Sequence, residues 1–313
     1  MDQSDAGIKR YLHLARVSWE VLRLYGIRGI LLTLVRCFKK VKSENLEDSP
    51  RAQDYIKGLV TVAILSKNRL DLIQPCLEAI HRFLSNKYKI EILIGDTGTT
   101  EPEVWQYYRE AADYYKNIEI IKFDSYYFSK NYNQLIESHA RGQYVILLNN
   151  DTMVTDNWLD NLIDPLADAQ IGIVGAKLLY PDDTIQHAGI EFNEQGRAFH
   201  IYAKQPRDFP EADYKALVPG VTFAGAAMRH KVFDRFQLDE NYKEEHQDTD
   251  FCLRLTEAGF KVLYNPAAVI YHFEYSSRDW RRGRLDILRL RKLWASKIKS
   301  IWAQKRQRLA YDA

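Results

Sequence analysis

The residues of this sequence that most clearly suggest chemistry are carboxylates beside short apolar runs. Asp151 follows the apolar run 144–148 in the stretch Asn149-Asn150-Asp151. A carboxylate that emerges there from a buried strand can bind a hard divalent cation together with the phosphates of a substrate. The same stretch is also typical of a turn or a helix N-cap, so both interpretations stay open.

A second acidic group lies in the segment 244–250, Glu-Glu-His-Gln-Asp-Thr-Asp, which leads into a helical pattern. Asp248 and Asp250 would stand in the first turn of that helix, where the helix dipole stabilises an ionised carboxylate. Such a group can accept a proton from a substrate hydroxyl, although simple N-capping is the alternative. His272 follows another apolar run and is either a metal ligand or a half-buried histidine.

The elements that would position these residues alternate between strands and helices. Strands separated by helices of 10–15 residues indicate βαβ units and an α/β fold with a mainly parallel sheet. The sequence predicts strands at 59–65, 90–95, 118–123, 144–148, 171–176, 221–228, 261–264 and 268–272. It predicts helices at 70–84, 103–115, 131–140, 157–166 and 248–258, and loops with a hairpin at 181–220.

Polar residues follow each of the first four predicted strands. Ligands of open α/β sheets bind beyond the carboxyl ends of the strands, so these residues predict a polar binding site at one sheet edge. The sequence contains neither GxGxxG nor GxxxxGK[ST], which disfavours a dinucleotide-binding Rossmann site and a P-loop. A bound phosphate would therefore need a cation. The polar segments are 66–69, 96–100, 128–133 and 149–152.

The order of these motifs resembles glycosyltransferase family 2. The resemblance covers roughly residues 59–277 and is carried by SKNR, GDTGTT, FSKNYNQ, LLNNDT, HQDTDFCLRL and YHFE. The segment 185–189, IQHAG, is similar to a loop of rhamnosyltransferase-like members, and FAGAA at 223–227 is similar to the family's small-residue strand beneath the donor sugar. Packing alone explains these last two segments equally well. The resemblance implies the GT-A fold, a Rossmann-like, mainly parallel sheet with helices on both faces.

The resemblance also implies roles for individual residues. Asp151, in the counterpart of the family's DxD motif, would bind a Mg²⁺ or Mn²⁺ ion on the diphosphate of a nucleotide sugar, and His272 would complete that site. Asp248, in the counterpart of the ED motif, would be the catalytic base, with Asp250 as a rival. The residues implied to bind the nucleotide sugar are Ser66, Asn68, Asp96, Lys130, Asn133 and Asn150.

The chain departs from the family pattern at two positions, where Asn149 and Gln247 replace acidic residues. The implied reaction is a metal-dependent, inverting hexosyl or deoxyhexosyl transfer to a glycan or lipid-linked acceptor in surface polysaccharide synthesis at the cell envelope. One alternative is a nucleotidyltransferase that makes a nucleotide sugar, which would want glycine in the loop at 66–69. The other is a non-catalytic GT-A-like scaffold, which the two replacements favour.

The net charge of +2 conceals an uneven distribution. Residues 1–42 carry +6 and residues 278–308 carry +10, whereas the body between them carries −13. We therefore divide the chain into a basic amphipathic helical arm with a linker at 1–57, a GT-A domain at 58–277 and a basic amphipathic C-terminal helix at 278–313. Basic helices with Leu and Trp on one face are typical of anionic membrane surfaces, and docking to a protein such as a partner transferase is the alternative.

Other features narrow the class of protein. The acidic body carries no nucleic-acid-binding motif, so we expect no nucleic-acid partner. The chain has no run of 18 apolar residues, and its first residues lack a signal-peptide pattern. The three cysteines are widely spaced and form no CxxC pair, which is typical of a reducing compartment. We expect a cytoplasmic protein that is peripheral on the cytoplasmic face of the membrane.

Overall fold

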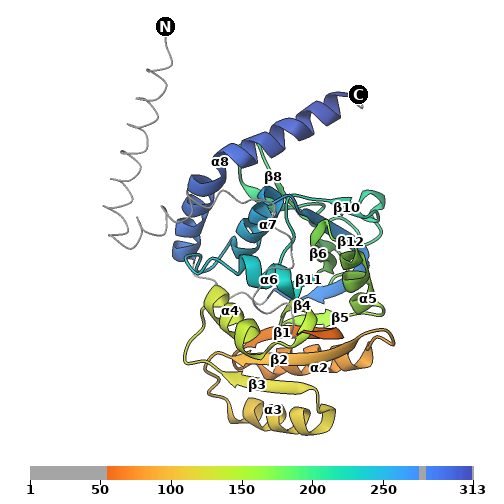
Figure 1. Ribbon diagram of the computed structural model, residues 1–313, viewed down its shortest axis with the longest axis vertical. Coiled ribbons are helices and arrows are strands. Elements are labelled where there is room, and N and C mark those ends of the chain that lie inside the picture. Colours follow the sequence, from red (N-terminus) through yellow and green to blue (C-terminus); the bar gives the residue numbers. More distant parts are fainter. Residues whose placement is uncertain (1–54, 275–279, 312–313) are drawn as a thin grey trace, which may run out of the picture. The chain divides into compact units, whose positions relative to one another are not determined.

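The structure is a computed structural model that describes residues 55–274 and 280–311. Its centre is a sheet with the strand order β10-β12-β6-β11-β4-β1-β2-β3, from which β5 and β7 branch (Figure 1). The strands of this sheet are β1 (Ile56–Ser66), β2 (Lys89–Asp96), β3 (Ile118–Lys122), β4 (Gly142–Asn149), β5 (Thr152–Val154), β6 (Ile171–Leu179), β7 (Ile185–His187), β10 (Ala216–Leu217), β11 (Gly225–Arg229) and β12 (Lys261–His272). A separate hairpin consists of β8 (Ile190–Phe192) and β9 (Ala198–His200).

Strand pairing confirms the prediction of a mainly parallel α/β sheet. β1 pairs in parallel with both β2 and β4, and β2 pairs in parallel with β3. β11 is inserted antiparallel between β4 and β6, while β12 runs parallel to β6. The carboxyl ends of β1, β2 and β4 therefore lie at one edge of the sheet.

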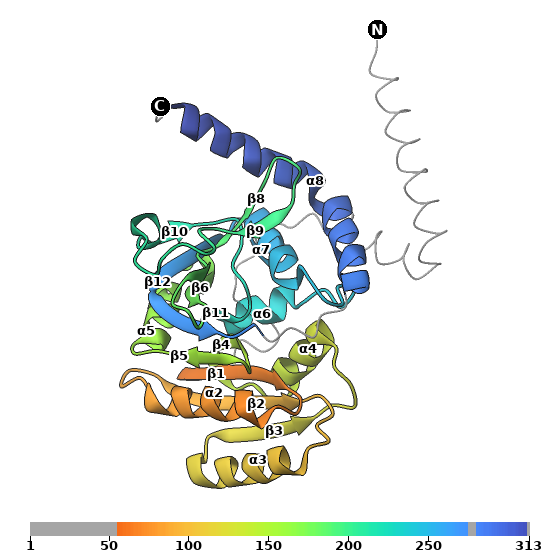
Figure 2. The same cartoon turned by 180° about the vertical axis from the view of Figure 1, so that it is seen from behind.

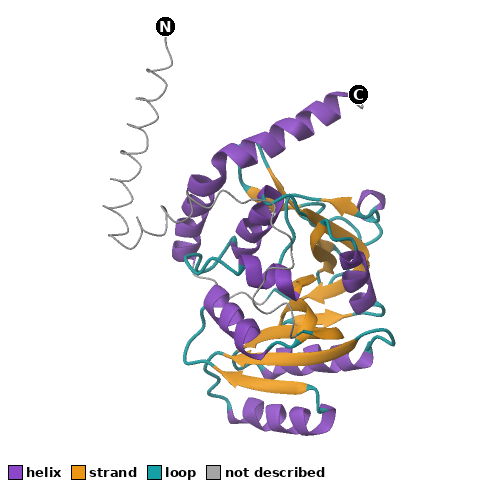
Figure 3. Ribbon diagram, in the orientation of Figure 1, coloured by secondary structure: helices purple, strands orange, loops and turns teal. Residues whose placement is uncertain are grey.

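Helices cover both faces of the sheet, as Figures 2 and 3 show. The helices are α2 (Leu70–Arg82), α3 (Pro102–Tyr115), α4 (Phe128–His139), α5 (Trp158–Ile163), α6 (His230–Phe236), α7 (Gln247–Glu257) and α8 (Trp280–Tyr311), with 3₁₀ turns at Asp164–Ala167 and Pro210–Ala212. One core joins α2, α3 and α5 to the sheet, and a second core joins α4, α6 and α7 to it. The alternation of strand side chains produces this division, since neighbouring residues of a strand face opposite sides. In β1, Val62 and Ile64 enter the first core, whereas Ala63 and Leu65 enter the second.

Three predicted elements differ from the observed ones. The strand predicted at 221–228 begins only at Gly225, because the preceding residues bond elsewhere: the amide of Thr222 donates to His187 Nε2 at 3.4 Å. The two strands predicted at 261–264 and 268–272 form one strand, β12, with a register shift between Asn265 and Val269. The sequence reasoning missed α6, a helix of 7 residues.

The C-terminal helix α8, which the sequence predicted as a basic amphipathic helix, packs one face against the body. Leu290, Trp294 and Ile298 are buried with Tyr242 and Leu253 of the body. The first turns of α8 accordingly lie beside α7 in both Figure 1 and Figure 2. None of the described helices combines the length and the hydrophobicity that a membrane-spanning segment needs. Of the N-terminal arm and linker predicted at 1–57, residues 1–54 lie outside the described residues, and β1 already begins at Ile56.

Candidate active site

The carboxyl ends of β1, β2 and β4 bring three predicted site residues together. The register pairs Ser66 with Asp96 and Leu65 with Asn149, so the segments that follow these strands share one edge. Asn150 Nδ2 donates to Ser66 Oγ at 3.2 Å and so joins the ends of β4 and β1. The polar cluster that the sequence predicted at this edge is therefore present as a set of neighbouring side chains.

Asp96 is almost completely buried, with 1% of its surface exposed. Its Oδ1 accepts the amides of Gly98 at 3.1 Å and Thr99 at 3.0 Å, which shapes the turn after β2. Its Oδ2 has no hydrogen-bond partner among the described residues. A buried carboxylate oxygen without a partner is costly, so Asp96 presents a strong acceptor for a ligand donor group.

Asn68 connects the two loops that follow β1 and β2. Its Oδ1 accepts the amides of Thr100 at 2.8 Å and Glu101 at 3.3 Å, and its backbone adopts a φ of 55°. Asparagine tolerates this left-handed region better than most residues. Asn68 thus fixes the shape of the loop pair that borders Ser66 and Asp96.

The two predicted residues of α4 occupy different environments. Lys130 is exposed, and its Nζ lies 6.0 Å from the ring centroid of Tyr127. Asn133 is buried, and its amide bridges α4 to Leu238: Oδ1 accepts the Leu238 amide at 2.8 Å, and Nδ2 donates to the Leu238 carbonyl at 3.0 Å. Asn133 therefore serves packing between α4 and the segment after α6, whereas Lys130 is available to an anion.

The predicted metal ligands Asp151, just before β5, and His272, at the end of β12, meet because β5 pairs with β12. His272 Nε2 lies 3.2 Å from Asp151 Oδ1, and both side chains are buried. Two ligands that each hold one ion at about 2.1 Å and at a right angle lie about 3 Å apart. The observed separation and the donor types therefore fit a divalent cation. No group of three or more His, Cys, Asp or Glu side chains gathers as a metal site in the described parts of the chain, so a substrate would supply further ligands.

Gln186 of β7 orients the ring of His272. Gln186 Nε2 donates to the His272 carbonyl at 3.4 Å and to Glu274 Oε2 at 3.2 Å, which leaves Oε1 facing His272 Nδ1 at 2.6 Å. This network assigns the proton to Nδ1 and the lone pair to Nε2. Nε2 also accepts Asn149 Nδ2 at 3.1 Å. A cation at Nε2 would replace the Asn149 bond, because both use the same lone pair of the ring.

Asp248 and Asp250 differ sharply in their surroundings, although both lie in the first turn of α7. Asp250 is 2% exposed, and its oxygens accept Trp294 Nε1 at 2.8 Å, Arg254 Nε at 2.8 Å and the Tyr242 hydroxyl at 3.4 Å. Asp248 is only partly buried, and its Oδ1 accepts the amide of Thr249 at 2.6 Å. Both oxygens of Asp250 are therefore occupied by hydrogen bonds, whereas Asp248 keeps part of its surface exposed.

The segment 221–225 runs between the two halves of the site. At one end, the Val221 amide donates to Cys252 Sγ of α7 at 3.5 Å. At the other end, Gly225 pairs with Leu148 beside the Asn149-Asn150-Asp151 stretch. A Cβ atom on Gly225 would lie 2.8 Å from Ile270 Cδ1, so a larger residue here would have to displace the Ile270 side chain. The segment thus links α7, through Val221, to the end of β4, through Gly225.

Sequence reasoning missed two contributors to the site. Gln186 was noted only as part of a loop, because a glutamine that bonds a histidine 86 residues away has no local signature. The polar contacts of α8 with the 239–250 segment were also missed, since the helix looked amphipathic and self-contained.

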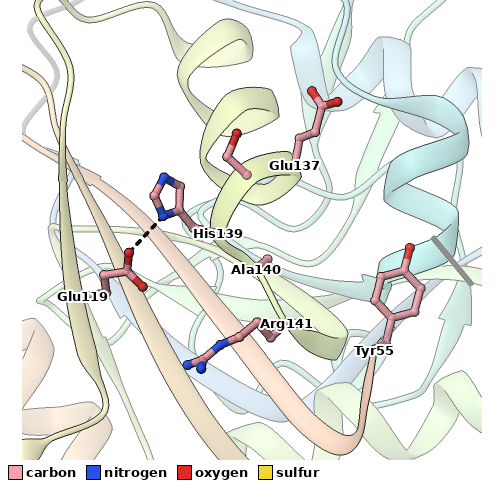
Figure 4. Close-up of a pocket in the computed structure, with 7 residues that line it drawn as sticks. Tyr55, Glu119, Glu137, His139, Ala140 and Arg141 are labelled. Carbon is pink, nitrogen blue, oxygen red and sulfur yellow. Dashed lines mark hydrogen bonds and ion pairs between the residues drawn. The ribbon is translucent and has the colours of Figure 1, made fainter. Parts of the chain in front are cut away.

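A cavity of about 410 Å³ lies at the opposite edge of the sheet (Figure 4). It borders Tyr55 before β1, Glu119 at the start of β3 and Arg141 before β4, so it belongs to the amino ends of the strands. Glu119 Oε1 and His139 Nδ1 pair at 2.9 Å on its wall. None of the predicted site residues lines it.

Comparison with known proteins places these features in a family. The sequence profile of glycosyl transferase family 2 matches residues 61–236, more than half of the chain. The O-antigen biosynthesis protein RfbC of Myxococcus xanthus is 27% identical over 227 residues, which are 70% of this chain and 18% of that protein. The chain spans a quarter or less of the length of the curated relatives it matches.

Solved glycosyltransferase structures share the fold. GalNAc-T7, solved with UDP, GalNAc and Mn²⁺, aligns with a TM-score of 0.60 at 12% identity, over 69% of this chain and 44% of its own. The mannosyltransferase PcManGT of Pyrobaculum calidifontis, solved with GDP-Man and Mn²⁺, aligns with a TM-score of 0.53 at 18% identity, over 87% of this chain and 70% of its own. At these identities the likeness shows the fold alone, and it confirms the predicted GT-A architecture.

Proposed function

This chain belongs to glycosyltransferase family 2, and on that premise we propose that it transfers a sugar from a nucleotide diphosphate donor to a hydroxyl of a glycan or lipid-linked acceptor. The similarity to an O-antigen biosynthesis protein supports a role in surface polysaccharide synthesis. The observation that carries the proposal is the pairing of His272 Nε2 with Asp151 Oδ1 at 3.2 Å, beside the unpartnered carboxylate oxygen of Asp96.

The donor would lie along the edge formed by β1, β2 and β4. Asp96 Oδ2 would accept a donor group of the nucleoside, and Ser66 with Asn150 would border the ribose. Asp151 and His272 would hold Mg²⁺ or Mn²⁺, which, when bound, offsets the charge of the diphosphate leaving group. Lys130, exposed at the start of α4, supplies a further positive charge to this edge.

Asp248 would take the proton from the acceptor hydroxyl. The oxygen then forms a bond to the anomeric carbon, while the bond from that carbon to the diphosphate oxygen breaks and its electron pair leaves with the nucleoside diphosphate. A single displacement of this kind inverts the anomeric centre. General-base catalysis of this type typically contributes about 10²–10⁴-fold to the rate.

A donor screen tests the proposal. The full-length protein would be incubated with UDP-, GDP- and dTDP-sugars, with Mn²⁺, Mg²⁺ or EDTA, and both thermal stabilisation and release of nucleoside diphosphate would be measured. At least one donor should raise the melting temperature in a metal-dependent way, since a ligand that binds only the folded state stabilises it. Asp151→Ala should lose this effect, whereas Asp156→Ala, an exposed aspartate of the same region, should keep it.

Each negative outcome has a separate meaning. Normal metal and donor binding by Asp151→Ala would place the cation elsewhere. Donor binding by the wild-type protein with no turnover on any acceptor fraction would favour the scaffold alternative. Formation of a nucleotide sugar from a sugar phosphate and a nucleoside triphosphate would favour the nucleotidyltransferase.

The outer face of α8 supports docking on an anionic membrane surface. Leu285, Leu288 and Leu293 are 67%, 61% and 44% exposed, and the exposed residues around them include Arg284 and Lys299. Asp286 is the single acidic residue of α8 within 283–301, and it is buried. An exposed helix face with leucines and only basic charges is complementary to anionic lipid headgroups.

Sedimentation with vesicles tests this docking. Binding of the full-length protein to phosphatidylglycerol-containing vesicles should exceed binding to neutral vesicles and should weaken with salt. The double change Leu285→Ser and Leu288→Ser should weaken it at least ~10-fold, because two leucines lose their burial in the interface. Leu84→Ser, at an exposed leucine of the body, is the matched control. If the double variant binds vesicles as well as the wild type, α8 does not make the membrane contact.

A further inference from the structure

The segment that leads into Asp248 has no regular secondary structure. Residues 243–245 form bends, and His246, the residue before α7, has a φ of 67°. A non-glycine residue is uncommon in this left-handed region, and its surroundings fix it there. No side-chain hydrogen bond caps the start of α7. The position of Asp248, two residues after His246, therefore depends on contacts from outside the segment.

Asp286 of α8 makes those contacts. Its Oδ2 accepts three consecutive backbone amides, those of Lys243 at 3.0 Å, Glu244 at 2.7 Å and Glu245 at 3.0 Å. Asp286 is 2% exposed, so the three bonds are shielded from water. Hydrogen bonds from amides to an ionised carboxylate are stronger than those between neutral groups.

Two further bonds from α8 hold the two ends of a longer segment, 239–250. Trp294 Nε1 donates to Asp250 Oδ1 at 2.8 Å, and Arg289 Nη2 donates to Asp239 Oδ2 at 2.6 Å. Burial acts to raise the pKa of Asp239, but the hydrogen bond and charge of Arg289 outweigh it and leave the pKa lowered. Asp239 and Asp250 thus accept bonds from α8 at the two ends of the 239–250 segment.

We propose that Asp286, assisted by Trp294, is a positioning residue that holds the 243–250 segment so that Asp248 meets the acceptor hydroxyl. The inference rests on the proposed function, and it assigns α8 a part in catalysis. The matched family region ends at residue 236, so both the segment and α8 lie beyond it. A displacement of about 1 Å at a reacting group can cost about 10²-fold in rate.

We call the three bonds of Asp286 to the 243–245 amides the α8 clamp. The proposed donor-binding residues at the carboxyl ends of the strands do not depend on it. Asp96 is bonded by the amides of Gly98 and Thr99, His272 by Gln186 of β7, and the Asp151 carbonyl accepts the amide of Phe273, so the bonds described for these three residues come from the sheet and its loops. Loss of the Asp286 bonds should consequently lower turnover while leaving donor affinity nearly intact. A general weakening of the fold would change both.

The experiment compares wild type, Asp286→Ala, Asp286→Asn and the control Ser296→Ala, an exposed position on the same helix. Hydrogen exchange of the full-length protein would report on the amides of Lys243, Glu244 and Glu245. We expect at least ~10-fold faster exchange of these amides in Asp286→Ala, a kcat at least 10-fold lower, and a donor dissociation constant within about 2-fold of wild type. Asp286→Asn keeps one acceptor oxygen and should lie between the two, and Ser296→Ala should match wild type.

The outcomes separate the clamp from the proposed function. Unchanged exchange at 243–245 in Asp286→Ala would overturn the clamp, whatever the activity. Faster exchange with wild-type kcat would overturn its catalytic role. A donor affinity that falls in step with kcat would show a merely structural effect. If Asp286→Ala does not fold, the same measurements on the milder Asp286→Asn variant decide the question. A wild-type protein that binds no donor would refute the proposed function instead. The exchange data would still show whether Asp286 protects the amides of 243–245.

Discussion

The two aspartates at the start of α7 should respond in opposite ways to the same change. We expect Asp248→Asn to fold like the wild type and to lose turnover, and Asp250→Asn to lose stability. The reason lies in their contacts, because Asp250 is 2% exposed and bonded to Trp294, Arg254 and Tyr242, whereas Asp248 is partly exposed and bonds only to Thr249 among the hydrogen bonds described. The pair therefore separates chemistry from structure within one helical turn.

The magnitudes follow from these contacts. Breaking a buried ion pair such as that of Asp250 with Arg254 costs about 3–5 kcal/mol, and each kcal/mol shifts the melting temperature of a protein of this size by about 2–4 °C. Asp250→Asn should thus melt roughly 6–20 °C lower. Asp248→Asn loses a favourable helix-dipole interaction of about 0.3–1 kcal/mol, which is at most about 4 °C. Its kcat should fall about 10²–10⁴-fold.

Thermal unfolding and single-turnover transfer, both on the full-length variants, measure the two effects. Donor affinity should be unchanged in Asp248→Asn, because its carboxylate is assigned to the acceptor. A stable and inactive Asp250→Asn together with an active Asp248→Asn would refute the assignment of the base. Loss of activity in both variants without loss of stability in Asp250→Asn would refute the structural role of Asp250.

Three further predictions concern the metal site, the thiols and acid stability. Gln186→Leu frees the His272 ring, so the Mn²⁺ dissociation constant, measured by electron paramagnetic resonance with nucleoside diphosphate present, should rise about 10–100-fold; an unchanged constant would contradict the orienting role. Burial raises the pKa of Cys76 and of Cys252 to about 12, so both thiols should resist a thiol reagent at pH 8 in the native protein and react after unfolding. Burial, with the charges of His200 and His272, holds the pKa of His187 well below its usual value. As the pH falls, the unfolded state therefore binds a proton before the folded state does. At pH values under about 6.5, the free energy of unfolding should decrease by up to ~1.4 kcal/mol for each pH unit. The slope should be smaller in His187→Gln.

The sequence predicted the sheet well because its signals are local. β1 and β4 are buried on both faces, so they read as continuous apolar runs, and their polar ends mark the binding edge. The start of β11 was wrong because Val221 and Thr222 are as apolar and β-branched as strand residues, yet their amides bond Cys252 and His187. No pattern within the segment could indicate partners that are more than 30 residues away.

The residue types of the candidate site could be predicted from the sequence, but the roles of individual residues could be predicted less well. Asp248 and Asp250 share a helix terminus, so their spacing left two candidates for one role. The difference between them arises from the partners of Asp250, which are Tyr242, Arg254 and, 44 residues beyond it on α8, Trp294. The bonds of Asn133 to the backbone of Leu238 likewise depend on tertiary packing, and its binding role stays a prediction. The metal, nucleotide and acceptor roles of the remaining residues stay predictions.

The two faces of the C-terminal helix α8 use their charged residues differently. Its inner face contributes Asp286, Arg289 and Trp294 to the segment that carries Asp248, so the polar residues there are consumed by intramolecular bonds. On its outer face, Arg284 and Lys299 are exposed together with Leu285, Leu288 and Leu293. If that face binds a lipid surface, the same helix sets the distance between the membrane and the base. An acceptor anchored in the membrane would then reach Asp248 with its hydroxyl already restricted in position, which is where an enzyme gains most from orientation.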